Sequence, residues 1–584
     1  MSARPAPGAR IASAFAGRLL GQGPGEWIAP VLARALPGAG LVLLCALVAA
    51  GLGLAAPMVT KALIDQGIMA RDMGALLHWA AVSFAVGLGS VGLGMVSGML
   101  HLRASARMLA DLRGVVLGAA LARDPLLPDL PLGESVARID GDSAEIQRFA
   151  FDSVLVAVNA VFRLAGGTVL MLLLDWRLAL LPVLAAPVEL AFLSWARDGT
   201  NSRAEEAREM RGVLGSHMTE SLATLGALRA YGAGGRRRAA FDGMQTQQVG
   251  VLARQRMWSE MVGAVSQMIS ALTRSAVLLV GGWLVIRGDW PIGTLVAFLA
   301  YATMMSGPLR NLLGLYHAQA KARVALDRLS GVIGAAAPLE AGASCPLRPQ
   351  ELEFEDAAAP DGGHAPVSCT LRAGERVLID GPSGIGKSRL MALLNGGAPR
   401  AGGHVRIDGR DAAEMSLASR ALAITHLAQR PVILRGTLAE NLRLGAPEAP
   451  DVALWNALAV ADLADWAAAR GGLDTALGET GSALSGGLRQ RIALARALLR
   501  PSGVFIFDES FSEIDAAACR RILTRIDAAH GERLRIFIAH AGPAREGAFT
   551  QTIVLSEAAP LRRNSLGDMP YQRAKARENA VWSE

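Results

Sequence analysis

Apolar residues fill the first 320 positions of this 584-residue chain in long runs, whereas later apolar runs are short and alternate with polar segments. Each long run is close to the ~20 residues that a helix needs to cross a bilayer. The pattern predicts six membrane-spanning helices, at about 39–61, 76–100, 153–174, 178–196, 260–286 and 292–315. We therefore expect an all-α six-helix transmembrane domain over residues 39–330, preceded by a tail, residues 1–38, with a short interfacial helix around Ile11–Leu20 as one interpretation of that tail.

The connections between these spans differ strongly in length and charge. Asp175–Arg177 joins the third and fourth spans, whereas the loops after the second and fourth spans run about 50–60 residues and are rich in arginine. Arginine-rich loops stay on the cytoplasmic side, so the long loops and both termini are predicted to be cytoplasmic, at the inner membrane. This bias accounts for the net charge of +7, and we expect no nucleic-acid partner. The long loops contain few helix breakers and are expected to be helical.

Several polar residues interrupt the predicted spans. A charge at membrane depth costs roughly 2.5–3.5 kcal/mol, so these side chains should face a polar interior. One interpretation is a pathway for anionic or carboxylate-bearing cargo, and the other is internal pairing, for example of Arg163 with Glu189. The candidate pathway residues are Asn159, Arg163, Glu189, Gln267 and Arg274.

Beyond the membrane half, residues 331–348 are rich in Gly and Ala and are expected to form a linker. Residues 349–555 alternate strand and helix patterns, which is typical of an α/β nucleotide-binding domain. Residues 556–584 form an arginine-rich tail. The four cysteines have no metal-site spacing and are expected to be free thiols.

The segment Gly381–Ser388 fits the phosphate-binding loop pattern G-x-x-x-x-G-K-[ST] between an apolar strand and a helix. Its glycines let the backbone wrap a polyphosphate, while Lys387 is expected to reach the β- and γ-phosphates and the Ser388 hydroxyl to bind Mg²⁺. The chain has only four lysines, so composition alone does not account for a lysine at this position. The candidate nucleotide-binding residues of this segment are Gly381, Ser383, Gly384, Gly386, Lys387, Ser388 and Arg389.

Two further apolar strands end in polar residues. Val504–Phe507 precedes Asp508 and Glu509, and Ile536–Ala539 precedes His540. Ligands of α/β sheets bind at the carboxyl ends of strands, so we expect Asp508 to hold Mg²⁺ and Glu509 to polarise the attacking water. His540 is a third candidate catalytic residue, beside the γ-phosphate.

The segment Leu484–Gln490 predicts a second helix start that can bind an anion. Ser485 is a good N-cap, and Gly486 and Gly487 leave the amino end of the helix open to a phosphate. Because the phosphate loop already holds one face of the nucleotide, this second helix start indicates that another chain closes over it.

These motifs, in this order, resemble those of ATP-binding cassette (ABC) transporters of the exporter half-transporter type, over essentially the whole chain. The resemblance implies a cassette domain with a helical subdomain, ATP and Mg²⁺ as ligands, and a dimer with two ATP sites at its interface. It also implies that Gln429 is the glutamine that senses Mg²⁺ and the membrane domain, and that Asp515 is the aspartate of the loop after Glu509.

One departure from the family pattern concerns the nucleotide base. Family members usually place an aromatic residue before the phosphate loop to stack on adenine, but the matching position here is near Ala359–Pro360. Phe354 and His364 are the only ring-bearing candidates nearby.

The resulting hypothesis is an ATPase that exports a small molecule, lipid or peptide by alternating access, as a homodimer. Two alternatives remain at this point: one subunit of a heterodimeric exporter, and a nucleotide-gated membrane protein with little turnover. A soluble cassette ATPase is excluded by the six predicted spans. The sequence does not identify the cargo, although the arginines in the spans favour a carboxylate-bearing metabolite or small peptide.

Overall fold

The computed structural model of the chain describes residues 27–127, 130–359, 363–429, 431–478, 484–539 and 542–557. The chain divides into two compact units, the first formed by Met1–Ala120 and Leu130–Gly334, the second by Leu121–Asp129 and Ala335–Glu584. One boundary between the two units lies at Gly334 and Ala335. The inclusion of Leu121–Asp129 in the second unit was not predicted, because this segment lies within the expected transmembrane domain.

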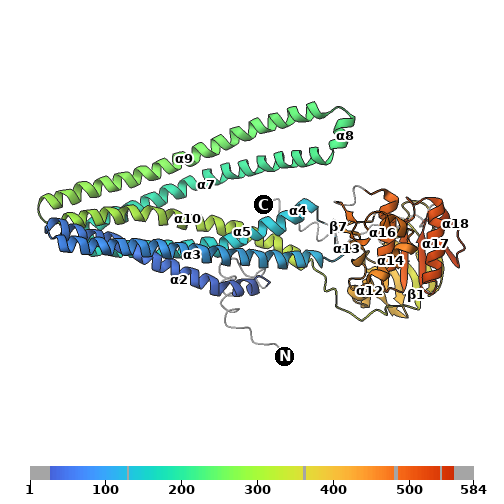
Figure 1. Ribbon diagram of the computed structural model, residues 1–584. Coiled ribbons are helices and arrows are strands. Elements are labelled where there is room, and N and C mark those ends of the chain that lie inside the picture. Colours follow the sequence, from blue (N-terminus) through green and yellow to red (C-terminus); the bar gives the residue numbers. More distant parts are fainter. Residues whose placement is uncertain are drawn as a thin grey trace. The chain divides into compact units, whose positions relative to one another are not determined.

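Six long helices make up most of the first unit, and each predicted span lies within one of them (Figure 1). They are α2 (Ala29–Ala62), α3 (Met73–Leu121), α6 (Val154–Leu174), α7 (Trp176–Ala223), α9 (Gly234–Ile286) and α10 (Ile292–Gly334). Among the described residues, five helical stretches are long and apolar enough to cross a membrane. A further apolar helical stretch, Ile292–Met305, lies in α10.

The long loops are helical, as predicted. α7 and α9 extend far beyond their apolar parts as an antiparallel pair that the short helix α8 (Leu225–Ala230) joins (Figure 1). The loop after α3 forms a series of short helical segments before α6. These are α4 (Leu132–Ala137), η2 (Arg138–Asp142), α5 (Ser143–Gln147) and η3 (Arg148–Ser153), and a similar segment, η1 (Leu63–Met69), follows α2.

The first helix starts earlier than the apolar pattern predicted. α2 begins at Ala29, within the segment expected to be a tail, because Ile28, Val31 and Leu32 are buried against Met108 and Leu112 of α3. Burial of these side chains stabilises a helical start that contains no long apolar run. The interfacial helix expected at Ile11–Leu20 lies outside the described residues.

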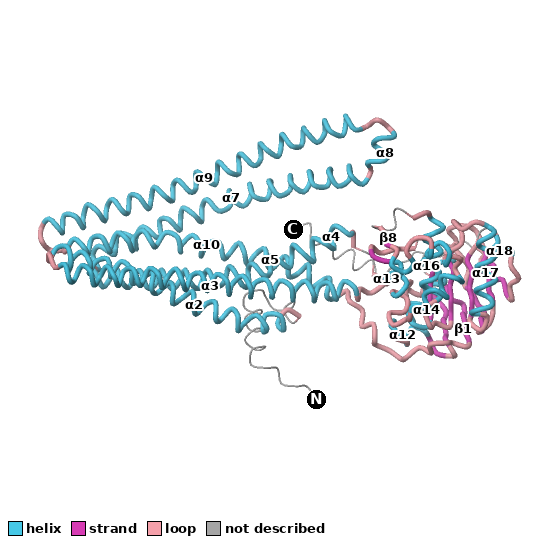
Figure 2. The backbone as a smooth tube through the Cα atoms, viewed as in Figure 1, coloured by secondary structure: helices cyan, strands magenta, loops and turns pink. Residues whose placement is uncertain are grey.

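Two sheets organise the second unit, whose strands are drawn in magenta in Figure 2. A four-stranded antiparallel sheet has the order β2-β1-β4-β5, and a five-stranded parallel sheet has the order β11-β3-β10-β9-β6. The strands of the first are β1 (Glu351–Ala358), β2 (Val367–Arg372), β4 (Gly402–Ile407) and β5 (Arg410–Asp411). Those of the second are β3 (Arg376–Asp380), β6 (Ile424–Leu427), β9 (Val504–Asp508), β10 (Leu534–Ile538) and β11 (Gln551–Val554), while β7 (Gly436–Thr437) pairs separately with β8 (Ala476–Leu477).

Helices cover the parallel sheet and supply the predicted helical subdomain. All five residues of β9 and all five of β10 are buried, as expected for central strands between helices. The α-helices of this unit are α11 (Lys387–Asn395), α12 (Leu417–Ala423), α13 (Leu438–Arg443), α14 (Asp451–Val460), α15 (Ala464–Ala468), α16 (Gly486–Leu498), α17 (Ala516–His530) and α18 (Pro543–Glu546), with the short η4 (Ala412–Glu414) and η5 (Gly472–Asp474). The predicted fold class, a helical transmembrane domain followed by an α/β nucleotide-binding domain, is confirmed. The four cysteines are free, as expected.

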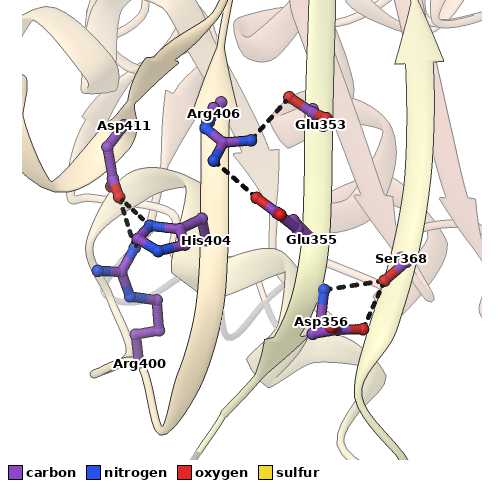
Figure 3. Close-up of polar contacts among 8 residues, drawn as sticks. All are labelled: Glu353, Glu355, Asp356, Ser368, Arg400, His404, Arg406 and Asp411. Atoms are coloured by element: carbon purple, nitrogen blue, oxygen red, sulfur yellow. Dashed lines mark hydrogen bonds and ion pairs between the residues drawn. The ribbon is translucent and has the colours of Figure 1, made fainter.

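Polar side chains on the antiparallel sheet are paired with one another (Figure 3). Asp411 accepts hydrogen bonds from Arg400 at 2.7 Å and from His404 at 2.8 Å. Burial alone would raise the pKa of Asp411, but these hydrogen bonds outweigh it and hold the pKa at about 2. Arg406 forms ion pairs with Glu353 at 3.2 Å and with Glu355 at 2.6 Å. The charges of this cluster are therefore satisfied within the sheet.

Candidate nucleotide-binding site

The parallel sheet brings the predicted nucleotide-binding motifs to one edge. β3, β10, β9 and β6 are neighbours in that order, and all run in the same direction. Their carboxyl ends therefore lie together, as do the residues that follow them: the phosphate loop after β3, Glu509 after β9 and Gln429 after β6. His540, predicted to follow β10, lies outside the described residues.

The backbone of the phosphate loop requires glycine at three positions. Gly381, Gly384 and Gly386 have φ values of 149°, 81° and 104°, in the region that side chains with a Cβ rarely adopt. α11 begins immediately afterwards, at Lys387, so its unpaired N–H groups open onto the loop. Ser383, Ser388 and Arg389 are exposed on this loop and on the first turn of α11. The loop and helix start thus form a concave anion-binding surface.

Lys387 is buried at the base of this loop, with 6% of its surface exposed. Its Nζ donates hydrogen bonds to the carbonyl oxygens of Gly381 at 2.7 Å and Pro382 at 3.0 Å. Burial lowers the pKa of Lys387, and the nearby carboxylates of Glu509, Asp380 and Asp508 oppose that effect. The ammonium group therefore faces the acids at the end of β9 from across the sheet edge.

The two acids after β9 differ in their surroundings. Asp508, the last residue of β9, is buried, with 6% of its surface exposed. Glu509 follows it with a backbone φ of 49°, which is strained for a residue with a side chain. Gln429 Nε2 donates a hydrogen bond to Glu509 Oε2 at 2.6 Å, and Glu509 N donates to the Ile538 carbonyl at 3.0 Å. The strained backbone thus directs a carboxylate toward the glutamine, an arrangement common at functional sites.

His426 lies beside this site, although the sequence pattern did not predict it there. His426 lies on β6, and its Nε2 is 3.4 Å from Asp508 Oδ2. A signal was available in the pattern, since this histidine lies three residues before Gln429 in a short, mainly apolar segment. His426 therefore lies beside the Asp508 carboxylate without a hydrogen bond to it among the described residues.

The predicted second anion-binding segment has the expected local structure. Ser485 caps α16, and its Oγ accepts a hydrogen bond from Leu488 N at 3.4 Å. Gly486 and Gly487 form the first turn of α16. Asp515 caps α17 by accepting from Ala518 N at 2.8 Å. Among the contacts of the described residues, none joins Ser485–Gly487 to the phosphate loop of the same chain.

The side chain of Glu513 lies against this helix start, which the sequence did not predict. A Cβ atom on Gly486 would overlap the Glu513 carboxylate, and one on Gly487 would lie 2.6 Å from the Glu513 carbonyl oxygen. Gln490, buried in α16 with 2% of its surface exposed, contacts the segment that contains Ser512 and Glu513. It donates to Ser512 Oγ at 3.1 Å and accepts from Glu513 N at 3.0 Å. A carboxylate therefore occupies the amino end of α16.

The oxygen groups at this site suit Mg²⁺. The Ser388 hydroxyl, the Asp508 carboxylate and the Gln429 amide oxygen are hard ligands, and Mg²⁺ is usually held by few protein ligands together with substrate phosphates. Accordingly, the described residues contain no group of three or more His, Cys, Asp or Glu side chains that would bind a metal alone. When bound, Mg²⁺ neutralises charge on the β- and γ-phosphates.

Neither ring considered for adenine stacking is exposed. Phe354 is 2% exposed in the core beneath β1, and His364 is 3% exposed. The His364 Nδ1 pairs with the Ala365 carbonyl at 2.8 Å. The structure therefore assigns neither side chain an open stacking face.

The predicted intramembrane residues fall into two groups. Glu189 is buried, with 4% of its surface exposed, and accepts a hydrogen bond from Ser266. No ion pair joins Glu189 to Arg163 among the described residues, so the internal partner of Glu189 is Ser266 rather than the arginine given as an example. Asn159 and Arg163 line one cavity of the first unit, and Gln267 and Arg274 line another.

Comparisons with known proteins agree with this arrangement. The family model for the ABC transporter transmembrane region matches residues 39–309, and the model described as ABC transporter matches residues 365–512. A multidrug efflux ATP-binding/permease protein of Mycobacterium tuberculosis is 30% identical over 79% of this chain, but the chain spans only 39% of that relative's length. An ATP-dependent lipid A-core flippase of Thiobacillus denitrificans is 26% identical over 83% of this chain and 85% of the flippase.

A solved structure shares the fold of the whole chain. A bacterial Atm1-family ABC exporter with ATP bound superposes with a TM-score of 0.77 at 22% identity, covering 95% of this chain and all of that one. Fold and site define a multi-pass membrane protein fused to a phosphate-loop nucleotide-binding domain. The two family models, each on its own half, place the chain in the ABC transporter family, with the organisation of an exporter half-transporter.

Proposed function

We propose that this protein uses ATP hydrolysis to export a small molecule, lipid or peptide across the inner membrane. The observation that carries the proposal is the convergence of Lys387, Asp508, Glu509 and Gln429 at one sheet edge, in a chain that also has membrane-spanning helices. Hydrolysis chemistry and a transmembrane path in one chain are the two requirements of a pump.

Each residue has a distinct role in the proposed hydrolysis. The phosphate loop and Lys387 bind the β- and γ-phosphates and stabilise the charge that develops during transfer. Glu509 orients the attacking water and accepts its proton, and the hydrogen bond from Gln429 holds one carboxylate oxygen in place. Asp508 and Ser388 would hold Mg²⁺, and His540 is assigned a role beside the γ-phosphate on the sequence pattern and the family resemblance alone. Water adds to the γ-phosphorus as the bond to the ADP oxygen breaks.

The proposed working unit is a homodimer. Ser485, Gly486, Gly487 and Asp515 of one chain would close over ATP on the phosphate loop of the other, with two such sites per dimer. The capped start of α16 supports this arrangement, because the amino end of a helix favours an anion and already has the Glu513 carboxylate against it. Both termini and the nucleotide-binding domain are proposed to be cytoplasmic, on the strength of the arginine bias.

The two alternatives make different predictions. A nucleotide-gated protein with little turnover would not need the strained Glu509 or its bond to Gln429, so these features favour a pump. A heterodimeric exporter would require a different partner chain for activity. The presence of Lys387, Asp508 and Glu509 together in this chain favours the homodimer.

The test is steady-state ATP hydrolysis by the chain purified alone in lipid nanodiscs, beside Glu509→Gln. The substitution keeps the size of the side chain and removes the proton acceptor, so we expect a loss of at least about 100-fold. Glu448→Gln, at an exposed acid of the same domain, is the matched control and should hydrolyse ATP as the unmodified chain does. Full activity of Glu509→Gln would refute the mechanism.

A further inference from the structure

Two cavities open within the helical unit and share a side chain. The first, about 700 Å³, is lined by residues of α2, α3, α6 and α10, and the second, about 570 Å³, by residues of α9 and α10. Thr303 of α10 lines both. The polar side chains of the first are Ser97, His101, Asn159, Arg163, Thr303 and Asn311, and those of the second are Gln267, Ser270, Arg274 and Thr303. Both cavities therefore border α10, and together they are called the α10 cavity.

Each part of the α10 cavity contains an arginine that has no partner among the described residues. Arg163 lies near the middle of α6, and Arg274 lies near the middle of the predicted span 260–286. Neither forms a hydrogen bond or an ion pair with any residue that the structure describes. A lone guanidinium at membrane depth is costly, and both side chains are exposed, so each is open to water or to an anionic partner.

The carboxylate within the predicted spans is already hydrogen-bonded to another side chain. Glu189, the one carboxylate in the interior of the six predicted spans, is buried against Ser266 and lines neither part of the cavity. Other cations of this unit do have acidic partners: Lys61 pairs with Asp65 at 3.1 Å and Arg254 with Glu206 at 2.8 Å. The two arginines of the α10 cavity differ from these cations in lacking a described acidic partner.

The helical periodicity gathers the polar groups around each arginine. Asn159 precedes Arg163 by four residues and so lies on the same face of α6, while Gln267, Ser270 and Arg274 share one face of α9. The rest of the lining is mainly small or apolar, and it includes Val156, Met268 and Met304. Apolar walls with a few convergent polar groups are typical of sites for amphiphilic ligands.

We propose that the α10 cavity is the cargo site and that Arg163 and Arg274 bind the oxyanion of an amphiphilic cargo, a carboxylate or a phosphate attached to an apolar body. This inference rests on the proposed export function and specifies its cargo class. The planar guanidinium donates paired hydrogen bonds that match the geometry of both oxyanions. Asn159 and Gln267 add neutral hydrogen-bonding groups, and the apolar walls bind the body.

The experiment measures binding without relying on hydrolysis. Radiolabelled dodecanoate is equilibrated with the full chain in nanodiscs of neutral phosphatidylcholine, without nucleotide, and unlabelled dodecyl phosphate, methyl dodecanoate and dodecylamine compete with it. We expect dodecyl phosphate to compete, and the neutral ester and the amine to compete at least about tenfold more weakly, since a charged hydrogen-bonding partner is lost. Equal competition by all three would overturn the proposal.

Variants then test the two arginines. Arg163→Gln and Arg274→Gln should each weaken dodecanoate binding about tenfold or more. Arg287→Gln, at the end of α9 where the guanidinium stacks on Trp283 and lines neither part of the cavity, is the matched control and should bind normally. Arg163→Lys and Arg274→Lys keep the charge and should retain part of the affinity, which separates loss of the site from misfolding. Unchanged binding by both glutamine variants would overturn the proposal.

Two further comparisons complete the test. One distinguishes a lipid headgroup from a free amphiphile as the source of the oxyanion, and the other separates failure of the cargo assignment from failure of the export proposal. If phosphatidylglycerol in the nanodisc competes with dodecanoate in the unmodified chain but not in the glutamine variants, the oxyanion is a lipid headgroup. If it does not compete, the cargo is a free amphiphile, and both results support the arginine site. If the chain hydrolyses ATP but binds no oxyanion, the export proposal stands and the cargo assignment fails. If the chain binds dodecanoate but hydrolyses no ATP, the oxyanion site stands and the export proposal fails.

Discussion

Glu513 places a negative charge where the proposed dimer must receive the phosphates of ATP. Its carboxylate lies against Gly486, at the start of α16. We predict that Glu513→Ala and Glu513→Gln lower the ATP concentration needed for half-maximal hydrolysis by about two- to fivefold, the size of effect typical of exposed charges. If the size of the Glu513 side chain rather than its charge hinders ATP binding, only the alanine variant will lower this ATP concentration. Kinetics of both variants beside Glu448→Gln check this, and unchanged values in both would contradict it.

His530 makes the stability of the nucleotide-binding domain depend on pH. Its ring packs edge-on against Phe505, with 5.5 Å between centroids, and its Nδ1 is buried without a hydrogen-bond partner among the described residues. Burial, and then the neighbouring Arg533, lower the pKa of His530 from 6.5 to about 4, while Glu532 opposes this. The unfolded chain therefore binds a proton more readily than the folded one between these values.

The sign of the His530 effect follows from that difference. Its contribution to the free energy of unfolding is fully present above pH 6.5 and is lost as the pH falls toward 4. The melting temperature of the unmodified chain should therefore fall more steeply from pH 6.5 to 4 than that of His530→Gln. Thermal unfolding across this range, normalised to pH 8 for each protein, measures it. Parallel curves would show that His530 does not titrate as described.

Single side chains were predictable from the sequence where a motif fixes their backbone. The positions of Lys387, Asp508 and Glu509 follow from strand ends and from the glycines of the phosphate loop. The contacts of Glu513 and Glu189 did not follow, because each depends on a residue far along the chain or on a neighbouring helix, Gly486 and Ser266 respectively. No local periodicity encodes such pairs.

At the scale of elements, the start of α10 is tied to the end of α2. Asp65 of η1 accepts a hydrogen bond from Gly293 N at 2.8 Å and pairs with Lys61 at 3.1 Å. A Cβ atom on Gly293 would lie 2.6 Å from both the Lys61 carbonyl and Asp65 Oδ1, and the carbonyl cannot move aside without shifting α2. This close approach fixes how the two helices meet.

We predict that Gly293→Ala destabilises the helical unit by about 1–3 kcal/mol, the usual cost of overpacking. The matched control is Gly282→Ala on α9, where an added Cβ meets no atom within 4 Å and alanine favours the helix. Thermal unfolding in nanodiscs compares the two variants. Equal melting temperatures would show that the joint at Asp65 tolerates displacement.

The hydrophobic pattern predicted the elements of the membrane half well, because a bilayer imposes long apolar runs that a sequence displays directly. It did not predict that Leu121–Asp129 belongs to the second unit. That attachment is made by backbone hydrogen bonds, Asp124 N to the Ala335 carbonyl and Ala337 N to the Ala122 carbonyl, both 2.8 Å. Backbone pairing of this kind leaves no mark on side-chain composition.

For the whole molecule, the central claim is that two copies of this chain form two shared ATP sites. Lys387→Met removes the phosphate-loop cation. Ser485→Asp keeps a good helix cap but places a negative charge where the partner's nucleotide would bind. In a homodimer, a mixed pair of these variants retains one site in which both halves are intact.

The deciding measurement is therefore the steady-state ATP hydrolysis of the two variants, reconstituted separately and as an equal mixture in nanodiscs. We predict that each variant alone is inactive and that the mixture recovers up to about a quarter of the unmodified rate, since half of random dimers are mixed and each has one intact site. A mixture as inactive as its components, beside an active unmodified chain, would contradict the shared-site dimer.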